Sequence, residues 1–321
     1  MVSIAVVGAG AVGGYYGALL ARAGHDVRFL LRRDLDAVQR GGWDIRSPHG
    51  DFRLANVQAF GLPAEMGQVD WVICSLKATA IDEARELVAP CVGRDTRILA
   101  LMNGLGIEER FAEWFGGERV FGGMAFVCIN RGEPGVIHHL DYGRVSIGHL
   151  MDNPAETEGL RVLLQSGGIE TAVAPNLRYA RWEKLCWNVP FNGLSVAAGG
   201  IGTKAILTDV PLRATAERAM REVVAAGNAD LRSVGSSASL DEDSVVMAMF
   251  QQTEAMGDYR TSMAIDYTLE RPLEVEAILG APLRRAEALG VDTPTMASLY
   301  ALVRAADLRN RGKLQEDDSP R

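Results

Sequence analysis

The chain has 321 residues, of which 48% are hydrophobic and 23% charged, a composition typical of a globular protein with a substantial core. Its formal net charge of −8, without a long basic run, argues against a nucleic-acid-binding protein. The four cysteines form no C-x-x-C pair, and none of the five histidines has ligand-like spacing, which argues against a disulfide framework and a metal site. We therefore expect a cytoplasmic protein that binds no metal.

A glycine-rich turn follows the first expected strand. Residues 4–7 are apolar and run into Gly8-Ala9-Gly10-Ala11-Val12-Gly13, which opens a helix expected over 15–23. In a dinucleotide site the first glycine permits the tight turn, the second lets backbone N–H groups approach a pyrophosphate, and the third lets helix and strand pack closely. The pyrophosphate then lies at the positive end of the helix. This context favours a dinucleotide site over a glycine-rich surface loop.

Residues 1–21 carry no charged side chain, so a signal peptide or a membrane span is the alternative interpretation of this segment. No Lys or Arg precedes the run, and glycines are spread through it. A central parallel strand, buried on both faces, and the helix packed on it have the same apolar character. We favour this second interpretation.

The end of the second expected strand, residues 26–31, indicates which cofactor binds. An NAD enzyme places Asp or Glu there to accept a hydrogen bond from the ribose 2′-hydroxyl, whereas this strand is followed by Arg32 and Arg33. Two guanidinium groups suit a 2′-phosphate, which they can bind bidentately. The sequence therefore favours NADP(H) over NAD(H), with a solvated basic pair as the alternative, and it does not choose between Arg32 and Arg33 as the phosphate ligand.

Strand-like and helical segments alternate through the first half of the chain. Further strands are expected over 70–75, 97–102 and 120–129, and helices over 81–88 and 107–115. This alternation predicts an α/β fold with a parallel, doubly wound sheet. Residues 136–147 are expected to form a hairpin at the sheet edge, turning at 141–143.

Helical periodicity replaces this alternation in the second half of the chain. The expected helices cover 177–197, 209–234, 243–256, 272–289 and 294–306. We therefore expect an NADP-binding domain of the Rossmann type over 1–175 and an all-helical substrate and catalytic domain over 176–311. The polar residues 312–321 are expected to form a disordered tail.

Two strand ends in the first domain carry candidate side chains. Lys77 follows one expected strand and Asn103 follows the next. Open α/β sheets bind their ligands at the carboxyl ends of the strands, so Lys77 suits a phosphate or a substrate carboxylate, and Asn103 suits the nicotinamide ribose or the substrate. The alternative for each is an ordinary loop residue.

The second domain contains a polar stripe on a mostly apolar helix. Lys184, Asn188 and Asn192 are spaced i, i+4 and i+8, so on a helix they share one face. One basic residue with two amides is typical of a pocket that binds an oxyanion, and a solvent-exposed stripe is the alternative. Pro190 removes one helical hydrogen bond, so a kink is expected there.

A third candidate segment contains Ser262 and Glu274. Pro272 suits the first turn of a new helix, which would place Glu274 near the N-terminus, where the helix dipole favours an ionised carboxylate. Ser262 could donate a hydrogen bond to a substrate carboxylate. A turn serine and a helix-start glutamate are the alternatives.

Taken together, these segments resemble the ketopantoate reductase (2-dehydropantoate 2-reductase) family over nearly the whole chain. The matching motifs are Gly8-Ala9-Gly10-Ala11-Val12-Gly13-Gly14, Ser75-Leu76-Lys77-Ala78, Asn103-Gly104-Leu105-Gly106, Lys184-Leu185 with Asn188 and Asn192, Ser262-Met263 with Asp266, Arg271 and Glu274, and Gly290-Val291-Asp292-Thr293-Pro294-Thr295. The resemblance implies a Rossmann-type domain followed by a helical domain like the C-terminal domain of 6-phosphogluconate dehydrogenase. One departure is Leu273, where the family commonly has threonine.

The resemblance also implies roles for individual residues. Lys184 takes the place of the family's catalytic lysine, and Glu274 matches its active-site glutamate, with a cofactor contact as well. The substrate-contacting positions are Asn103, Asn188, Asn192 and Ser262. The cofactor-contacting positions are the glycine turn from Gly8 to Gly13, Arg32, Lys77 and Asn103.

The implied activity is the NADPH-dependent reduction of the C2 ketone of 2-dehydropantoate to (R)-pantoate, a step of pantothenate and coenzyme A biosynthesis. A related NADP-dependent reductase of another 2-oxo acid or ketone is one alternative. A non-enzymatic NADP(H)-sensing protein is another. The expected partner is a small-molecule 2-oxo acid, with neither nucleic acid nor membrane, and a homodimer is left open.

Overall fold

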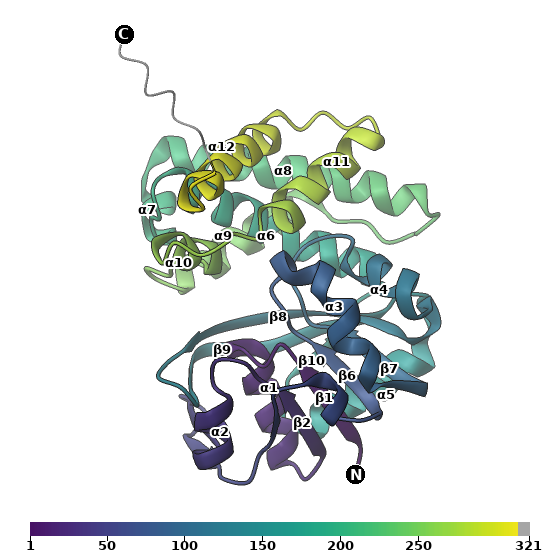
Figure 1. Cartoon of the computed structure of the whole chain (residues 1–321). Coiled ribbons are helices and arrows are strands. Elements are labelled where there is room, and N and C mark those ends of the chain that lie inside the picture. Colours follow the sequence, from purple (N-terminus) through teal and green to yellow (C-terminus); the bar gives the residue numbers. More distant parts are fainter. Residues whose placement is uncertain (314–321) are drawn as a thin grey trace. The chain divides into compact units, whose positions relative to one another are not determined.

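The computed structural model describes residues 1–313, which fall into two compact units (Figure 1). The first covers residues 1–180 and the second begins at Arg181. Apart from Gly312 and Lys313, the expected disordered tail lies outside the described residues.

The first unit is built on a mixed sheet, which has ten strands within the described residues. Its order is β4-β3-β9-β8-β7-β6-β1-β2-β5, and β10 pairs with β9. The strands are β1 (Ser3–Val7), β2 (Asp26–Leu30), β3 (Trp43–Arg46), β4 (Phe52–Leu54), β5 (Gln58–Phe60), β6 (Val69–Cys74), β7 (Val92–Ala100), β8 (Val120–Arg131), β9 (Val136–His149) and β10 (Thr171–Val173). The expected parallel sheet is confirmed for β5, β2, β1, β6, β7 and β8, whereas β8 and β9 pair antiparallel.

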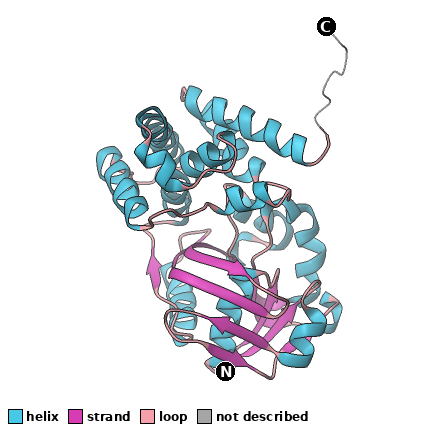
Figure 2. Ribbon diagram, turned by 90° about the vertical axis from the view of Figure 1, so that its left-hand side faces the viewer, coloured by secondary structure: helices cyan, strands magenta, loops and turns pink. Residues whose placement is uncertain are grey.

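Helices cover both faces of this sheet (Figure 2). They are α1 (Ala11–Arg22), α2 (Leu35–Gly41), α3 (Ile81–Val88), α4 (Ile107–Phe115) and α5 (Pro154–Ser166). Ile4 and Val6 of β1 belong to one core cluster with residues of α1 and α5, while Ala5 and Val7 point to the other face and are equally buried. Burial of β1 on both faces explains the uncharged run at the start of the chain.

The expected hairpin turn at 141–143 is wrong. The chain turns instead at 132–135, where the Gly132 N–H donates to the carbonyl of Val136, and β9 then continues without a break to His149. Tyr142 and Gly143 have φ angles of 62° and 133°, and the register between β8 and β9 shifts beside them. Tyr142 and Gly143 lie in a β-bulge, because a bulge accommodates a positive φ angle within a paired strand.

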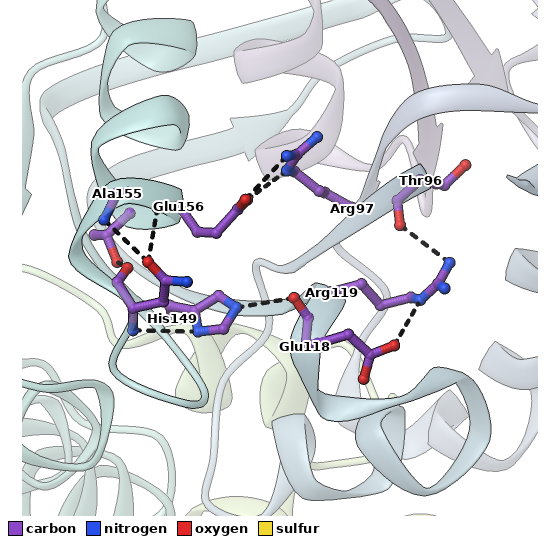
Figure 3. Close-up of polar contacts among 9 residues, drawn as sticks. Thr96, Arg97, Glu118, Arg119, His149, Ala155 and Glu156 are labelled. Atoms are coloured by element: carbon purple, nitrogen blue, oxygen red, sulfur yellow. Dashed lines mark hydrogen bonds and ion pairs between the residues drawn. The ribbon is translucent and has the colours of Figure 1, made fainter. Parts of the chain in front are cut away.

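A polar cluster lies where the parallel pairing of β7 and β8 begins (Figure 3). Arg97 of β7 donates two hydrogen bonds of 2.5 and 3.0 Å to Glu156 of α5, and this contact lowers the pKa of the Glu156 carboxyl. His149 accepts at Nδ1 from the Met151 N–H, so its Nε2 carries the proton and donates to the carbonyl of Glu118. This cluster lies at the end of the sheet opposite to the carboxyl ends of β7 and β8.

The regular elements described in the second unit are helices (Figure 2). They are α6 (Leu177–Ala197), which begins in the first unit, α7 (Thr203–Thr208), α8 (Val210–Ser233), α9 (Glu242–Ala255), α10 (Ser262–Thr268), a π-helical turn (Glu276–Gly280), α11 (Ala281–Ala288) and α12 (Pro294–Asn310). Four of the five expected helical segments are thus confirmed, with α7 and α10 in addition, whereas the expected helix over 272–289 begins only at Val275. No helix in the described part of the chain is long and apolar enough to span a membrane.

Buried polar contacts join these helices. The Trp182 indole N–H on α6 donates to Asp230 on α8 at 2.9 Å, and Arg285 on α11 donates to the other oxygen of the same carboxylate, also at 2.9 Å. The Glu222 carboxylate of α8 accepts from the Thr295 and Met296 N–H groups in the first turn of α12. These contacts fix α6, α8, α11 and α12 relative to one another, and the fully buried Asp230 carboxylate requires such partners.

The expected placement of Pro272 is wrong. Residues 271–274 have no regular structure, and the helical backbone begins at Val275, so Pro272 precedes the first turn. The Leu273 N–H donates instead to the carboxylate of Asp307 on α12, at 2.9 Å. Glu274 is nevertheless next to the helix start, as expected.

Candidate functional site

The glycine turn lies where the strand order of the sheet reverses. From β1 the chain moves to β2 on one side, and later to β6 on the other side of β1. The Ser75 hydroxyl, just after β6, donates to the carbonyl of Gly8, just after β1, at 2.9 Å. Such a switch point at the carboxyl ends of parallel strands is the usual position of a ligand in an open α/β sheet.

The backbone of this turn fits an anionic ligand. Gly8 has a φ angle of +87°, and a Cβ added there would lie 2.6 Å from the Leu76 nitrogen. A Cβ on Gly10 would meet only the Gly8 carbonyl oxygen, at 3.9 Å. Among the described residues α1 has neither a side-chain cap nor an acidic residue in its first turn, so the positive end of its dipole is available to a phosphate.

Alanine substitutions should separate the structural glycine from the one that approaches the ligand. Gly8→Ala should destabilise the protein by at least about 2 kcal/mol, because it combines backbone strain with a backbone clash. Gly10→Ala should leave the melting temperature unchanged and weaken the binding of a nicotinamide dinucleotide about tenfold or more, because its methyl group would occupy the space expected for the pyrophosphate. Thermal unfolding and NADPH fluorescence titration measure the two effects. Normal NADPH affinity in Gly10→Ala would contradict the placement of the pyrophosphate.

The basic pair after β2 is exposed. The Arg32 side chain is 81% exposed, and its nearest acidic partner is Glu83, with a nitrogen–oxygen distance of 4.0 Å. Arg33 is 57% exposed and lies 3.9 Å from Asp34. Asp34 is buried and forms an ion pair with Arg131, from the end of β8. Since Arg131 engages this carboxylate, the positive charge of Arg32 and Arg33 remains available to an anion.

Lys77 and Asn103 lie at the carboxyl ends of neighbouring strands, as expected. Lys77 follows β6 and is exposed, and Asn103 follows β7 and is half-buried. Because β6 and β7 pair in parallel, with Cys74 opposite Ala100, the two segments leave the same edge of the sheet. Both residues therefore belong to the same edge as the glycine turn.

Helix α6 carries the predicted polar stripe, and the stripe is not a solvent face. Asn188 and Asn192 are 4% and 1% exposed, and Lys184 is half-buried. The helix continues through Pro190. The two buried amides require polar partners, because burying an amide without partners costs free energy.

Asn192 connects α6 with the segment that carries Ser262. Its Oδ1 accepts from the Met263 N–H at 3.2 Å, which orients the side-chain amide. Its Nδ2 is buried and has no hydrogen-bond partner within the described residues. Ser262 is the first residue of α10, and the Thr261 hydroxyl caps that helix by accepting from Ala264. The structure therefore brings Asn192 and Ser262 to neighbouring positions, which the sequence alone did not show.

Glu274 is 4% exposed, and backbone hydrogen bonds on both sides of it fix its position. The Leu273 N–H donates to Asp307, and the Glu274 carbonyl accepts from Ile278 in the following turn. Leu273, the departure from the family pattern, is itself buried in the core. Glu274 lies directly before the helical backbone that begins at Val275, which is the position that the sequence predicted.

Comparison with known proteins identifies the family. Residues 4–152 match the family described as ketopantoate reductase PanE/ApbA, and residues 176–307 match its C-terminal domain. The chain belongs to the ketopantoate reductase family. The fold of this family, a Rossmann-type unit followed by helices, is the one expected from the sequence.

Individual ketopantoate reductases match over their full length. The 2-dehydropantoate 2-reductase of Nostoc sp. is 40% identical over 98% of this chain and 98% of that protein. The crystal structure of the 2-dehydropantoate 2-reductase of Geobacter metallireducens has a TM-score of 0.91 and 42% identity, and covers 95% of this chain and 99% of that one. D-mandelate dehydrogenase, solved with NADH and anilino(oxo)acetate, shares the fold with a TM-score of 0.87 and 23% identity, covering 96% of this chain and 99% of that one.

Sequence reasoning missed two side chains beside the candidate residues. Arg131 lies 97 positions from the Asp34 that it engages, so no local pattern could reveal the pair. The Lys184 Nζ lies over the indole ring of Trp187, 5.7 Å from the ring centroid. Their i, i+3 spacing on α6 was the available signal for the second contact.

Proposed function

We propose that this chain catalyses the NADPH-dependent reduction of the C2 ketone of 2-dehydropantoate to (R)-pantoate, a step of pantothenate biosynthesis. The observation that carries the proposal is the full-length likeness to a curated 2-dehydropantoate 2-reductase. The buried polar stripe of α6, with an unpartnered Asn192 Nδ2 in the described part of the chain, supports it, because a substrate oxygen would satisfy that donor.

The residues of the first unit fit NADP(H). The open Cβ position of Gly10 and the uncapped N-terminus of α1 suit a pyrophosphate, and the exposed Arg32 and Arg33 suit a 2′-phosphate. Lys77 and Asn103 leave the same sheet edge, where they would contact the nicotinamide half and the substrate. A bound NADPH supplies the hydride for the ketone carbon.

In this proposal the residues of the second unit bind the substrate and move its proton. Lys184 provides positive charge and a proton at the ketone oxygen, where negative charge develops. Asn188 and Asn192 orient the substrate, and Ser262 donates to its carboxylate. Glu274 accepts a hydrogen bond from a substrate hydroxyl, such as the one at C4 of 2-dehydropantoate.

A panel of 2-oxo acids tests the function. We expect 2-dehydropantoate to give the highest kcat/KM when NADPH consumption is followed by absorbance. A higher kcat/KM with another 2-oxo acid or ketone would assign the chain to a related reductase. NADPH binding without turnover of any member of the panel would favour the NADP(H)-sensing alternative.

The double substitution Arg32→Ala/Arg33→Ala should remove most of the preference for NADPH over NADH. Each charge-assisted hydrogen bond contributes about 1.5–3 kcal/mol, so the ratio of the two dissociation constants should fall by about 10–100-fold. NADH affinity should hardly change, because NADH has no 2′-phosphate. Arg40→Ala, an exposed arginine on α2, is the matched control and should keep the preference. Equal affinity for the two cofactors in the unaltered protein would refute the assignment.

A further inference from the structure

The indole of Trp187 is fixed on several sides inside the second unit. Its N–H donates to the Thr253 hydroxyl of α9 at 2.9 Å, and that hydroxyl donates in turn to the carbonyl of Met249 at 2.6 Å. The ring packs against Phe191 and Tyr259, with centroid distances of 5.2 and 6.2 Å. Trp187 is 5% exposed and Thr253 is fully buried, so the ring has little freedom to move.

The loop that carries Tyr259 is fixed as well. Thr203, a fully buried residue at the start of α7, donates through its backbone N–H to the Tyr259 carbonyl at 2.8 Å, and its hydroxyl approaches the same oxygen at 3.1 Å. Contacts from α6, α9 and the Tyr259 loop, which α7 holds in turn, therefore fix the orientation of the Trp187 indole.

The face of this indole meets the side chain of Lys184. The Nζ atom lies 5.7 Å from the ring centroid, within the range in which an ammonium is attracted by the negative face of an aromatic ring. Tryptophan is the aromatic residue that binds cations best. Lys184 is half-buried, where such an attraction is stronger than at a fully exposed site.

We infer that Trp187 is a positioning residue for catalysis: its anchored indole face holds the Lys184 ammonium in place and stabilises its charged form. The inference rests on the proposed role of Lys184 as proton donor. Trp187 thereby affects the reactivity of Lys184 without touching the substrate. Thr253 of α9 orients the Trp187 indole, and the indole in turn orients the Lys184 ammonium.

The lysine content of this chain allows a direct measurement on Lys184. The lysines are Lys77, Lys184, Lys204 and Lys313, so protein labelled with ¹³C at the lysine Cε gives few NMR signals to assign. We expect Trp187→Leu to lower the pKa of Lys184 by about one unit, because the charged form loses the ring. This measurement needs neither substrate nor turnover, so it distinguishes failure of this inference from failure of the proposed function.

Activity provides the second measurement. Trp187→Leu should lower kcat about 5–30-fold, move the alkaline limb of the pH–rate profile to lower pH, and leave the dissociation constant of NADPH unchanged. Trp187→Phe keeps an aromatic face and should recover most of kcat and of the Lys184 pKa. In the background of Lys184→Ala, Trp187→Leu should cause little further loss of kcat, since the two residues act as a unit.

Trp182 provides the matched control. It lies on the same helix, is fully buried, and donates its indole N–H to Asp230. Because Trp182 is two residues before Lys184, the two side chains lie on different sides of the helix. Trp182→Leu should lower the melting temperature without moving the Lys184 titration or the pH profile. The other charged residues on the elements that carry or surround Lys184 and Trp187 are all retained in every variant. They are Arg178, Arg181, Glu183, Lys204, Glu242, Asp243, Glu254, Asp258 and Arg260.

Two results would overturn the inference. One is a Lys184 titration that is the same in Trp187→Leu, Trp182→Leu and the unaltered protein. The other is a Trp187→Phe variant with the same fall in kcat and in the Lys184 pKa as Trp187→Leu, since an aromatic face at this position would then contribute nothing.

Discussion

Replacement of Lys184 by alanine should lower kcat by roughly 10²–10⁴, the usual range for loss of a general acid. Lys184 acts on the transition state in the proposed mechanism, because only there does the ketone oxygen carry negative charge. The dissociation constant of NADPH should hardly change, since the glycine turn and the arginine pair belong to the first unit. Single-turnover kinetics and NADPH titration measure the two quantities.

The control for this prediction is another lysine of the second unit. Lys204 on α7 is exposed, and Lys204→Ala should retain normal kcat and KM. If Lys184→Ala kept a near-normal kcat while NADPH binding collapsed, Lys184 would be a cofactor ligand. The role of acid would then pass to Lys77.

Replacement of Glu274 by alanine should raise KM for 2-dehydropantoate by about 10–100-fold, because a hydrogen bond to a buried carboxylate contributes about 1.5–3 kcal/mol. Glu274 is 4% exposed, so water cannot readily replace the lost acceptor. A 2-oxo acid without the C4 hydroxyl should show a much smaller change in KM. Steady-state kinetics with the two substrates tests this difference.

Glu276 offers a matched control two residues further along the chain. It is exposed and engages Arg284 and the Tyr300 hydroxyl at 2.9 and 2.8 Å. Glu276→Ala should therefore leave KM unchanged for both substrates. An equal rise in KM for both substrates in Glu274→Ala would show that Glu274 supports the fold of the pocket and does not bind the hydroxyl.

The sequence alone located the parts of the candidate site that depend on local spacing. The G-x-G-x-x-G turn after an apolar strand, the i, i+4, i+8 stripe of α6 and the helical periodicity of the second half are properties of neighbouring residues. Their backbone geometry follows from steric rules and from the repeat of the helix. For this reason β1, α1, α6 and α8 agree with prediction to within a few residues, except at the first turn of α1.

Only the tertiary structure decided how distant segments meet. Asn192 accepts a hydrogen bond from Met263, 71 positions away, and Arg131 engages Asp34 across 97 positions. Burial likewise excluded a solvent face for the two amides of α6, and strand pairing placed a bulge where the hairpin turn at 141–143 was expected. Side-chain burial and register depend on packing across the whole unit, whereas a sequence pattern reports only neighbours along the chain.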